Sequence, residues 1–224
     1  MNGNELAAVR ESVAETSRKL HAHELVLGTA GNVSARVGDL IAITATGATL
    51  ATATPDDITV VDLTGKIHLG RLRPTSELKI HLGIYRSSEA GAVVHAHSPK
   101  AVSLSLVTDE LPVIHYQQLL LGGALPVVPF APFSTDELAA STLSALEHKS
   151  AAILAHHGSV AVGATLDKAL DNALLLEWLC QIYLDAAAVQ PPASLTDEQL
   201  RAVVETAVRT GYGTTHTADP RNIG

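Results

Sequence analysis

Two histidines separated by a single residue are the part of this sequence best suited to chemistry. His95 and His97 follow an apolar run, and residues i and i+2 of a strand point to the same face, so both imidazoles can reach one ion. Glu77 upstream and His157 downstream offer two further ligands. Each of these features alone is also typical of structural histidines or of an acid at a helix start. Together, three imidazoles and a carboxylate predict a tetrahedral site for Zn²⁺ or another borderline divalent ion.

Three short segments rich in hydroxyls and glycine predict an anion site. They are residues 29–32, residues 44–47, and the pair Thr75 and Ser76 directly before Glu77. Backbone N–H groups in tight glycine turns and at helix starts bind phosphate well. Each segment alone is typical of an ordinary turn or cap. The three together, beside a candidate metal ligand, favour a small phosphorylated substrate.

Size, composition and charge narrow the class of protein. With 224 residues and 46% hydrophobic side chains, the chain suits one large α/β domain, and we expect residues 1–224 to form it. A net charge of -8 and an aromatic content of 3% argue against a nucleic-acid partner, because phosphate backbones select basic surfaces and bases stack on aromatic rings. The segment from about residue 211 is rich in Gly and Thr, which is typical of a mobile tail.

The other reactive side chains have ordinary explanations. Cys180 is the single cysteine, lies in an apolar helical pattern and cannot form an internal disulfide. The N-terminus lacks a signal-peptide pattern and no apolar run is long enough to cross a bilayer, so we expect a cytoplasmic protein with no membrane partner. His115 fits core or pocket equally well. Five further histidines are expected to be solvated or structural: His21, His23, His68, His81 and His148.

Hydrophobic periodicity predicts a chain of alternating helices and strands. Strands are expected over residues 33–36, 40–44, 59–63, 66–69, 125–130, 151–155 and 160–163, with another ending at residues 95–97. Helices are expected over residues 5–23, 78–86, 166–188 and 196–209, with one starting at Pro99 and one capped by Ser134 that runs to about residue 147. The pattern predicts a three-layer α/β/α domain with a central, mainly antiparallel sheet.

Several short motifs occur in an order that resembles the class II aldolase/adducin family. They are residues 31–34, 74–77, 95–98, 114–116, 122–123, 129–138 and 156–158. The resemblance extends from about Glu5 to Tyr212, and it is closest to the branch that cleaves ketose 1-phosphates of the L-fuculose type. Thr75 stands where that branch has serine, which keeps the hydroxyl.

The resemblance implies a cofactor and a phosphate site at particular residues. It implies one Zn²⁺ per subunit held by Glu77, His95, His97 and His157, with Glu77 displaced by the substrate to act as a base. The phosphate group of the substrate is then expected on the following residues: Thr29, Gly31, Asn32, Thr46, Gly47, Thr75 and Ser76.

Two tyrosines acquire expected roles in the same way. Tyr116 matches a tyrosine of the family's active-site wall, and Tyr212 stands where the family places a proton donor near the C-terminus. The alternative for Tyr212 is that it anchors the tail. The resemblance also implies a homotetramer whose pockets lie at subunit boundaries.

These features together predict a zinc-dependent aldehyde-lyase. The expected reaction is the reversible cleavage of a ketose 1-phosphate to dihydroxyacetone phosphate and an aldehyde, with the metal stabilising the charge that develops on bond cleavage. The same site would also suit a sugar-phosphate decarboxylase or dehydratase. An epimerase is less favoured, because it requires an acid near Tyr116, where Gln117 and Gln118 stand. An adducin-like module without catalytic activity is the alternative from a different class.

Overall fold

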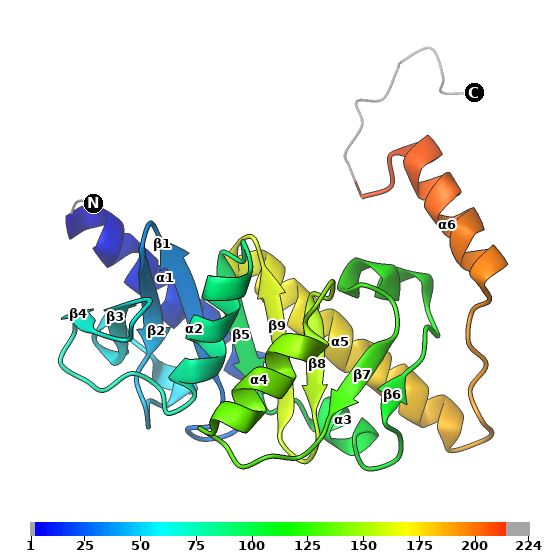
Figure 1. The fold of residues 1–224 in the computed structure, drawn as a ribbon, viewed down its shortest axis with the longest axis horizontal. Helices are drawn as coiled ribbons and strands as arrows, with labels where there is room; N and C mark the ends of the chain where they lie inside the picture. The colour runs from blue at the N-terminus through cyan, green and yellow to red at the C-terminus, as the bar shows by residue number, and fades with distance from the viewer. Residues whose placement is uncertain (1–2, 214–224) are drawn as a thin grey trace.

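The computed structural model describes residues 3–213 and shows a nine-stranded sheet enclosed by helices (Figure 1). The strands are β1 (Asn32–Val37), β2 (Leu40–Thr44), β3 (Ile58–Asp62), β4 (Ile67–Leu69), β5 (Ala92–Ala96), β6 (Glu110–Leu111), β7 (Leu125–Val128), β8 (Ala151–Leu154) and β9 (Gly158–Gly163). Their order is β4-β3-β2-β1-β5-β9-β8-β7-β6. Neighbouring strands pair antiparallel except β7 and β8, which are parallel. The predicted mainly antiparallel sheet is confirmed.

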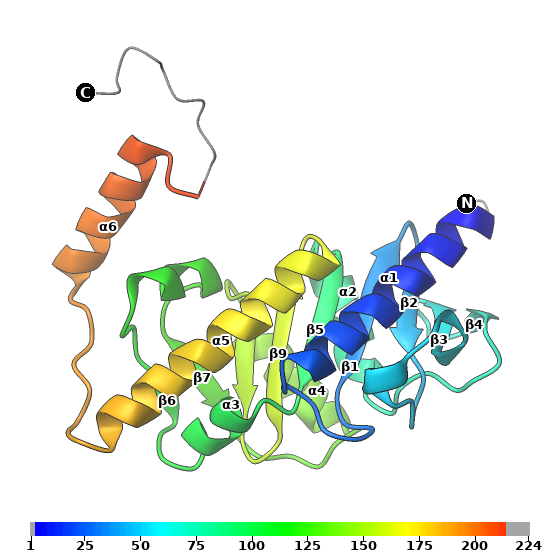
Figure 2. The same cartoon turned by 180° about the vertical axis from the view of Figure 1, so that it is seen from behind.

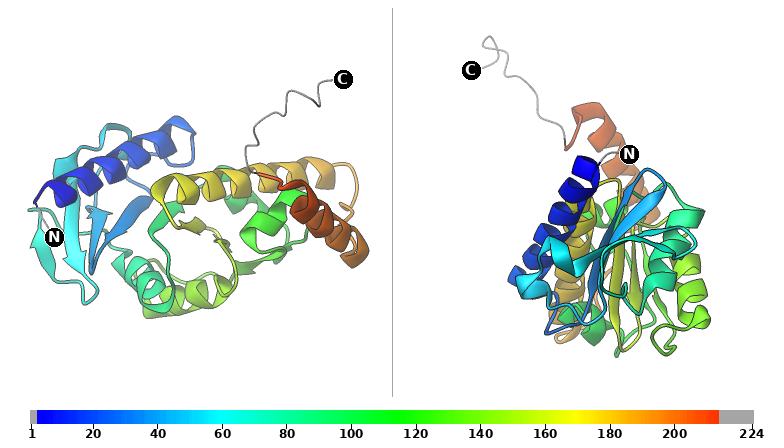
Figure 3. Two further views of the ribbon diagram at one scale, coloured as in Figure 1. Left: turned by 90° about the horizontal axis from the view of Figure 1, so that it is seen from above. Right: turned by 90° about the vertical axis from the view of Figure 1, so that its left-hand side faces the viewer.

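Helices cover both faces of the sheet (Figures 2 and 3). One face packs against α1 (Gly3–Ala22), α3 (Pro99–Leu104) and α5 (Leu166–Ala187), and the other against α2 (Leu78–Ser87) and α4 (Asp136–Ala145). Short 3-10 turns, η1 (Leu50–Thr52), η2 (Pro55–Asp57) and η3 (Tyr116–Leu121), lie in the connections. The last helix, α6 (Asp197–Thr210), stands apart from the sheet and buries none of its residues. This arrangement is the expected three-layer domain.

Strand alternation separates two hydrophobic cores and leaves polar groups on one side. Val33 and Ala35 of β1 belong to the core under α1 and α5. Their neighbours Asn32 and Ser34 therefore point to the opposite face, toward α2. Asn32 pairs with His95 of the adjacent β5, so the two side chains lie next to each other on that face. The centre of the sheet thus carries a polar strip into an otherwise apolar layer.

The start of α4 differs from the prediction by one residue. Thr135, not Ser134, is the N-cap, and its hydroxyl accepts a hydrogen bond from the backbone N–H of Leu138. Ser134 has a φ of 65° and donates its hydroxyl to the carbonyl of Ser76 instead, 2.7 Å away. Ser134, which the sequence suggested as a helix cap, therefore connects the segment before α4 to the turn before α2.

Strand β6 and the end of α6 are two further places where the structure can be compared with the sequence prediction. Strand β6 was not expected, because two residues are too short to show an alternating pattern. The predicted tail begins at Gly211, which caps α6 in the left-handed conformation (φ 63°), and residues 214–224 lie outside the described part of the chain.

Cys180 and the long helix around it behave as the sequence suggests. The cysteine is buried in α5 among apolar neighbours, and burial raises the pKa of its thiol. It therefore acts as a small hydrophobic side chain. Among residues 3–213, no helix combines the length and the apolar character needed to span a membrane.

Candidate active site

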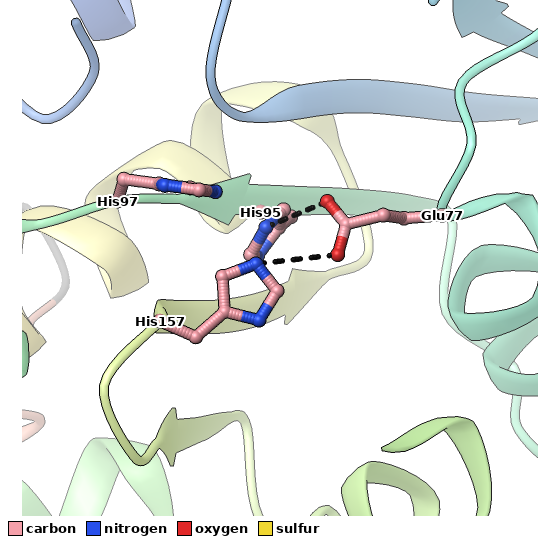
Figure 4. Close-up of side chains that lie close together, drawn as sticks. All are labelled: Glu77, His95, His97 and His157. Atoms are coloured by element: carbon pink, nitrogen blue, oxygen red, sulfur yellow. Dashed lines mark ion pairs between the residues drawn. The ribbon is translucent and has the colours of Figure 1, made fainter. Parts of the chain in front are cut away.

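Four side chains far apart in the sequence meet at one end of the central strands (Figure 4). His95 lies near the end of β5, His97 directly follows that strand, His157 is in the β8–β9 turn, and Glu77 is the N-cap of α2. One ligand atom from each lies within 4.8 Å of the others. Ligands about 2 Å from a tetrahedral Zn²⁺ are about 3.3 Å apart. Small side-chain adjustments would therefore close the group around an ion.

The hydrogen bonding of His95 leaves a site for a cation. Its Nδ1 lies 2.9 Å from the carbonyl oxygen of Ser159 and must donate to it. In a neutral ring Nε2 then carries a lone pair, and it faces Glu77 Oε2 at 2.9 Å. Glu77 Oε1 lies 3.3 Å from His157 Nε2. Among the described residues, Glu77 Oε1 and His95 Nε2 are buried polar atoms without a hydrogen-bond partner, which is the environment a divalent cation fits.

The pKa shifts of the group favour the metal-binding protonation state. Burial opposes ionisation of Glu77, but the adjoining His95, His157 and Asn32 outweigh it and hold its pKa well below the usual range. Burial, followed by the neighbouring imidazoles, lowers the pKa of His97 to about 4, and burial also lowers that of His157. At neutral pH the carboxylate is ionised and these two rings are neutral, as metal ligation requires.

Close backbone contacts hold the ligand-bearing turns in place. A Cβ atom on Gly158 would lie 2.1 Å from the carbonyl oxygen of Ala96, so only glycine lets the turn after His157 pack against the end of β5. On the other side, the Glu177 carboxylate accepts hydrogen bonds from the backbone N–H groups of Lys100 and Ala101, at 2.8 and 3.0 Å. This contact fixes the start of α3, two residues after His97.

A cavity of about 450 Å³ opens beside the four side chains of the candidate metal cluster. Glu77, His97 and His157 line it, together with every residue predicted to bind phosphate: Thr29, Gly31, Asn32, Thr46, Gly47, Thr75 and Ser76. None of the described residues that line it is Lys or Arg. An anion there would be held by neutral donors rather than by cationic side chains.

The donors around this cavity are oriented by contacts to the sheet. Gly31, with a φ of 79°, leaves room for the carbonyl of His95, which would lie 2.9 Å from an added Cβ. The backbone N–H groups of Thr46 and Thr75 donate to the carbonyls of Arg73 and Thr44. Thr46 and Thr75 can then bind a ligand only through their side-chain hydroxyls, and Thr75 Oγ1 also accepts a hydrogen bond from the backbone N–H of Glu77 at 3.3 Å. The side-chain amide of Asn32 already has a partner in the cluster, because it donates a hydrogen bond to Glu77 Oε2 at 3.0 Å.

Sequence reasoning missed two aromatic residues at the site. Phe130 and Phe133 line the cavity and are exposed by 63% and 68%, although no role in the site was predicted for either. The sequence signal that could have indicated this role is the pair of phenylalanines interleaved with two prolines in residues 129–133. His81, expected to be solvated or structural, is fully buried and bonded to Asn32, so the structural alternative holds.

The two predicted tyrosines lie together but do not line this cavity. The hydroxyls of Tyr116 and Tyr212 are 3.3 Å apart, and Gln117 donates to the Tyr212 hydroxyl at the same distance. Both tyrosines line a separate hollow along one face of α6. His115 stacks on Tyr116 and contacts Trp178 edge to face, so it belongs to this aromatic group and not to the metal cluster.

Comparisons with known proteins agree on one family. A model of the class II aldolase and adducin N-terminal domain matches residues 11–184, which contain the ligand cluster and the cavity. The L-fuculose phosphate aldolase of Escherichia coli O6:H1 is 38% identical over 92% of this chain and 95% of that protein. The 5-methylthioribulose-1-phosphate/5-deoxyribulose-1-phosphate aldolase of Rhodospirillum rubrum is 34% identical over 88% of this chain and 90% of that protein. A solved structure of L-fuculose 1-phosphate aldolase, 30% identical, superposes with a TM-score of 0.84 over 89% of this chain and 96% of that chain.

The ligand cluster yields a direct prediction about metal content. Replacing His95→Ala should remove most of the bound Zn²⁺, because it deletes the most deeply buried ligand, while circular dichroism shows the fold retained. His156→Asn is the matched control: His156 is adjacent to His157 but outside the cluster, and asparagine tolerates its φ of 58°. Elemental analysis after dialysis measures both. Normal zinc content in the His95 variant would contradict the site.

Proposed function

This chain belongs to the class II aldolase and adducin family, and from that premise we propose that it is a zinc-dependent aldolase acting on a ketose 1-phosphate. The products would be dihydroxyacetone phosphate and an aldehyde, and the reaction would be reversible. The preferred substrate type is L-fuculose 1-phosphate, in line with the name of the similar protein from Escherichia coli O6:H1. The Rhodospirillum rubrum relative is named for two other ketose 1-phosphates, which share the phosphorylated end of the sugar.

One observation carries this proposal. The Glu77–His95–His97–His157 cluster adjoins a cavity that also contains all seven residues expected to bind phosphate. A ketose 1-phosphate carries its phosphate on C1 and its carbonyl on the adjacent C2, so it can place one at the hydroxyl-rich end and the other at the cluster. When bound by the four residues, Zn²⁺ would supply Lewis-acid polarisation of the carbonyl.

The residues around the phosphate position the substrate. Thr46, Thr75 and Ser76 would offer hydroxyl donors, and the glycine turns at Gly31 and Gly47 would allow close approach of the backbone. Binding at several fixed donors restricts the orientation of the sugar, which is a large part of the rate gain available to any enzyme. No cationic side chain is needed for this role.

Glu77 would move the proton in the cleavage direction. The hydroxyl on the carbon that becomes the aldehyde loses its proton to the carboxylate, the adjacent C–C bond breaks, and an acid returns a proton to the carbon left on dihydroxyacetone phosphate. Asn32 donates a hydrogen bond to the carboxylate and helps to keep the pKa of Glu77 low. A substrate that pushes the carboxylate away from Asn32 would therefore make it a stronger base.

The tyrosines would act across a subunit boundary. Within one chain, Tyr116 and Tyr212 lie outside the cavity, while α6 leaves Val204 and Val208 exposed by 51% and 80%. An apolar helix face of this kind is typical of a protein contact. We propose a homotetramer in which the phenol of Tyr212 closes the cavity of a neighbouring copy and returns the proton to carbon, with Tyr116 forming part of the wall.

The reaction is tested with a panel of phosphorylated sugars. We expect zinc-loaded protein to release dihydroxyacetone phosphate from L-fuculose 1-phosphate or from a 5-deoxypentulose 1-phosphate. The released dihydroxyacetone phosphate is measured by its enzymatic reduction with NADH. The same sugars without phosphate serve as the control and should react far more slowly. Conversion to an epimer, loss of CO₂ or loss of water would instead indicate one of the related reactions. Metal binding without turnover of any sugar would favour a module without catalytic activity.

The base is tested by a change that keeps its shape. Glu77→Gln should lower kcat by about 10²–10⁴-fold, the usual contribution of general acid–base catalysis, while phosphate binding is retained. Inhibition by inorganic phosphate measures the binding site separately from turnover. A kcat near the wild-type value would exclude Glu77 as the base.

The role of Tyr212 is tested by removing only its hydroxyl. Tyr212→Phe should slow cleavage and hydrogen exchange at the donor carbon with little change in KM or Tm, whereas Tyr183→Phe, on α5, should change neither rate. Mixing the Glu77→Gln and Tyr212→Phe proteins under subunit exchange should raise the activity above that of either variant alone, because hybrid boundaries contain one intact site. Failure of complementation in exchanged oligomers would contradict a site shared between copies.

A further inference from the structure

A ladder of buried polar side chains runs between β1 and α2 and ends on Glu77. We call it the polar ladder, and its members are Asn32 and Ser34 on the strand and His81 and Tyr85 on the helix. All four are buried, with exposures between 0 and 4%. His81 and Tyr85 are not part of the cavity lining, and neither has a role in the proposed chemistry.

The two elements bring these residues together because their repeats match. Every fourth residue of a helix lies on one face and advances about 6 Å, while every second residue of a strand lies on one face and advances about 6.6 Å. Glu77, His81 and Tyr85 follow the first spacing, and Asn32 and Ser34 follow the second. Successive helix residues therefore meet successive strand residues.

Hydrogen bonds connect every step of the ladder. Tyr85 Oη lies 2.7 Å from Ser34 Oγ, and Ser34 Oγ lies 2.7 Å from His81 Nδ1. His81 Nε2 lies 2.5 Å from Asn32 Oδ1, and Asn32 Nδ2 lies 3.0 Å from Glu77 Oε2. The chain is continuous from the hydroxyl of Tyr85 to the carboxylate.

The carboxylate sets the direction of all these bonds. An ionised carboxylate only accepts, so the Asn32 amide must turn its Nδ2 toward Glu77 and its Oδ1 toward His81. His81 must then donate from Nε2, and in a neutral ring its Nδ1 accepts the proton of Ser34. Burial, with a smaller contribution from His95, lowers the pKa of His81 to about 3, so the ring is neutral. Ser34 in turn accepts from Tyr85, and every donor points toward Glu77.

We propose that His81 is a positioning residue for the metal centre, acting through Asn32 on Glu77. This inference rests on the proposed metal site. Without the Nε2 donor of His81, the buried Oδ1 of Asn32 loses its partner, and the amide is held only by its bond to Glu77. A shift of the amide that gives Oδ1 a new partner would weaken that bond, and the carboxylate would lose both a donor and its fixed position. Among the described residues, the His81 side chain forms hydrogen bonds with Ser34 and Asn32 and does not line the cavity, so its hydrogen-bonded path to Glu77 runs through one amide.

The test compares substitutions that keep or remove a single donor. Glutamine carries an N–H near the place of imidazole Nε2, whereas asparagine reaches only the place of Nδ1 and leucine carries neither. We expect His81→Leu and His81→Asn to weaken Zn²⁺ affinity by about 10-fold to 100-fold, the usual cost of losing an outer contact of a metal site. His81→Gln should recover most of that loss. Tyr85→Phe is the matched control, because it removes the far end of the ladder and leaves the bond between His81 and Asn32 intact.

The measurements separate positioning from a purely structural role. Zn²⁺ affinity is measured on metal-free full-length protein by competition with a chromophoric chelator, and the Co²⁺-substituted proteins report ligand geometry through their visible absorption. A structural role would lower Tm and leave the spectrum unchanged. A positioning role changes the Co²⁺ spectrum in His81→Asn and restores it in His81→Gln. If His81→Leu does not fold, the comparison of His81→Asn with His81→Gln still tests the positioning role.

The outcomes distinguish this inference from the proposed function. Equal Zn²⁺ affinity and equal Co²⁺ spectra in wild-type, His81→Asn and His81→Gln proteins would overturn the positioning role and leave the aldolase proposal intact. Failure of the wild-type protein to bind either metal would overturn the metal site itself and, with it, this inference.

Discussion

The buried carboxylate of Glu77 is the constraint on which the rest of the structure depends. It is 5% exposed, and moving an ionised carboxylate out of water costs several kcal/mol unless other groups compensate. The start of α2 supplies the positive end of a helix dipole, and Asn32 supplies a hydrogen bond. Lone pairs on the facing imidazoles add to the need for a cation between them. The adjacency of β1, β5 and β9 is what brings Asn32, His95 and the carbonyl of Ser159 into range at once.

The anion end of the cavity is built on a different principle from the metal end. Its described lining contains no Lys or Arg, and the whole chain has a net charge of -8. Long-range attraction therefore does little to bring a phosphate to the site. Affinity must come from short, directional donors, which hold only a ligand of the right shape. A cation at the four side chains of the cluster would place a positive charge at the edge of the same cavity, so occupancy of the metal site and of the anion site should support each other.

The sequence was sufficient to predict most elements and the four side chains that meet in the candidate metal cluster, because both leave local signals. The pair His95 and His97 after an apolar run reflects strand alternation, and the fold class follows from the periodicities. Contacts between elements left weaker signals. Ser134 carries cap chemistry, but its hydroxyl bonds the carbonyl of Ser76, and this depends on a turn 58 residues away. The separation of Tyr212 from the cavity depends equally on where α6 lies, which no local pattern records.

The sequence of α2 contains a sign of the polar ladder, but the pattern of one helix alone cannot identify the hydrogen-bond partners. His81 and Tyr85 lie on α2 beside the buried Ile80 and Ile84, so the helix buries an apolar stripe and a polar stripe together. A buried polar stripe destabilises a fold unless each group finds a partner. The partners are on β1, whose alternate residues can be matched to the helix only when the register of α2 over the strand is known. Helix α2 and strand β1 run in the same direction. Starting from Glu77, each further turn of the helix therefore meets the next inward-facing residue of the strand. The geometry that satisfies the buried groups therefore also directs their donors toward Glu77 in the candidate metal cluster.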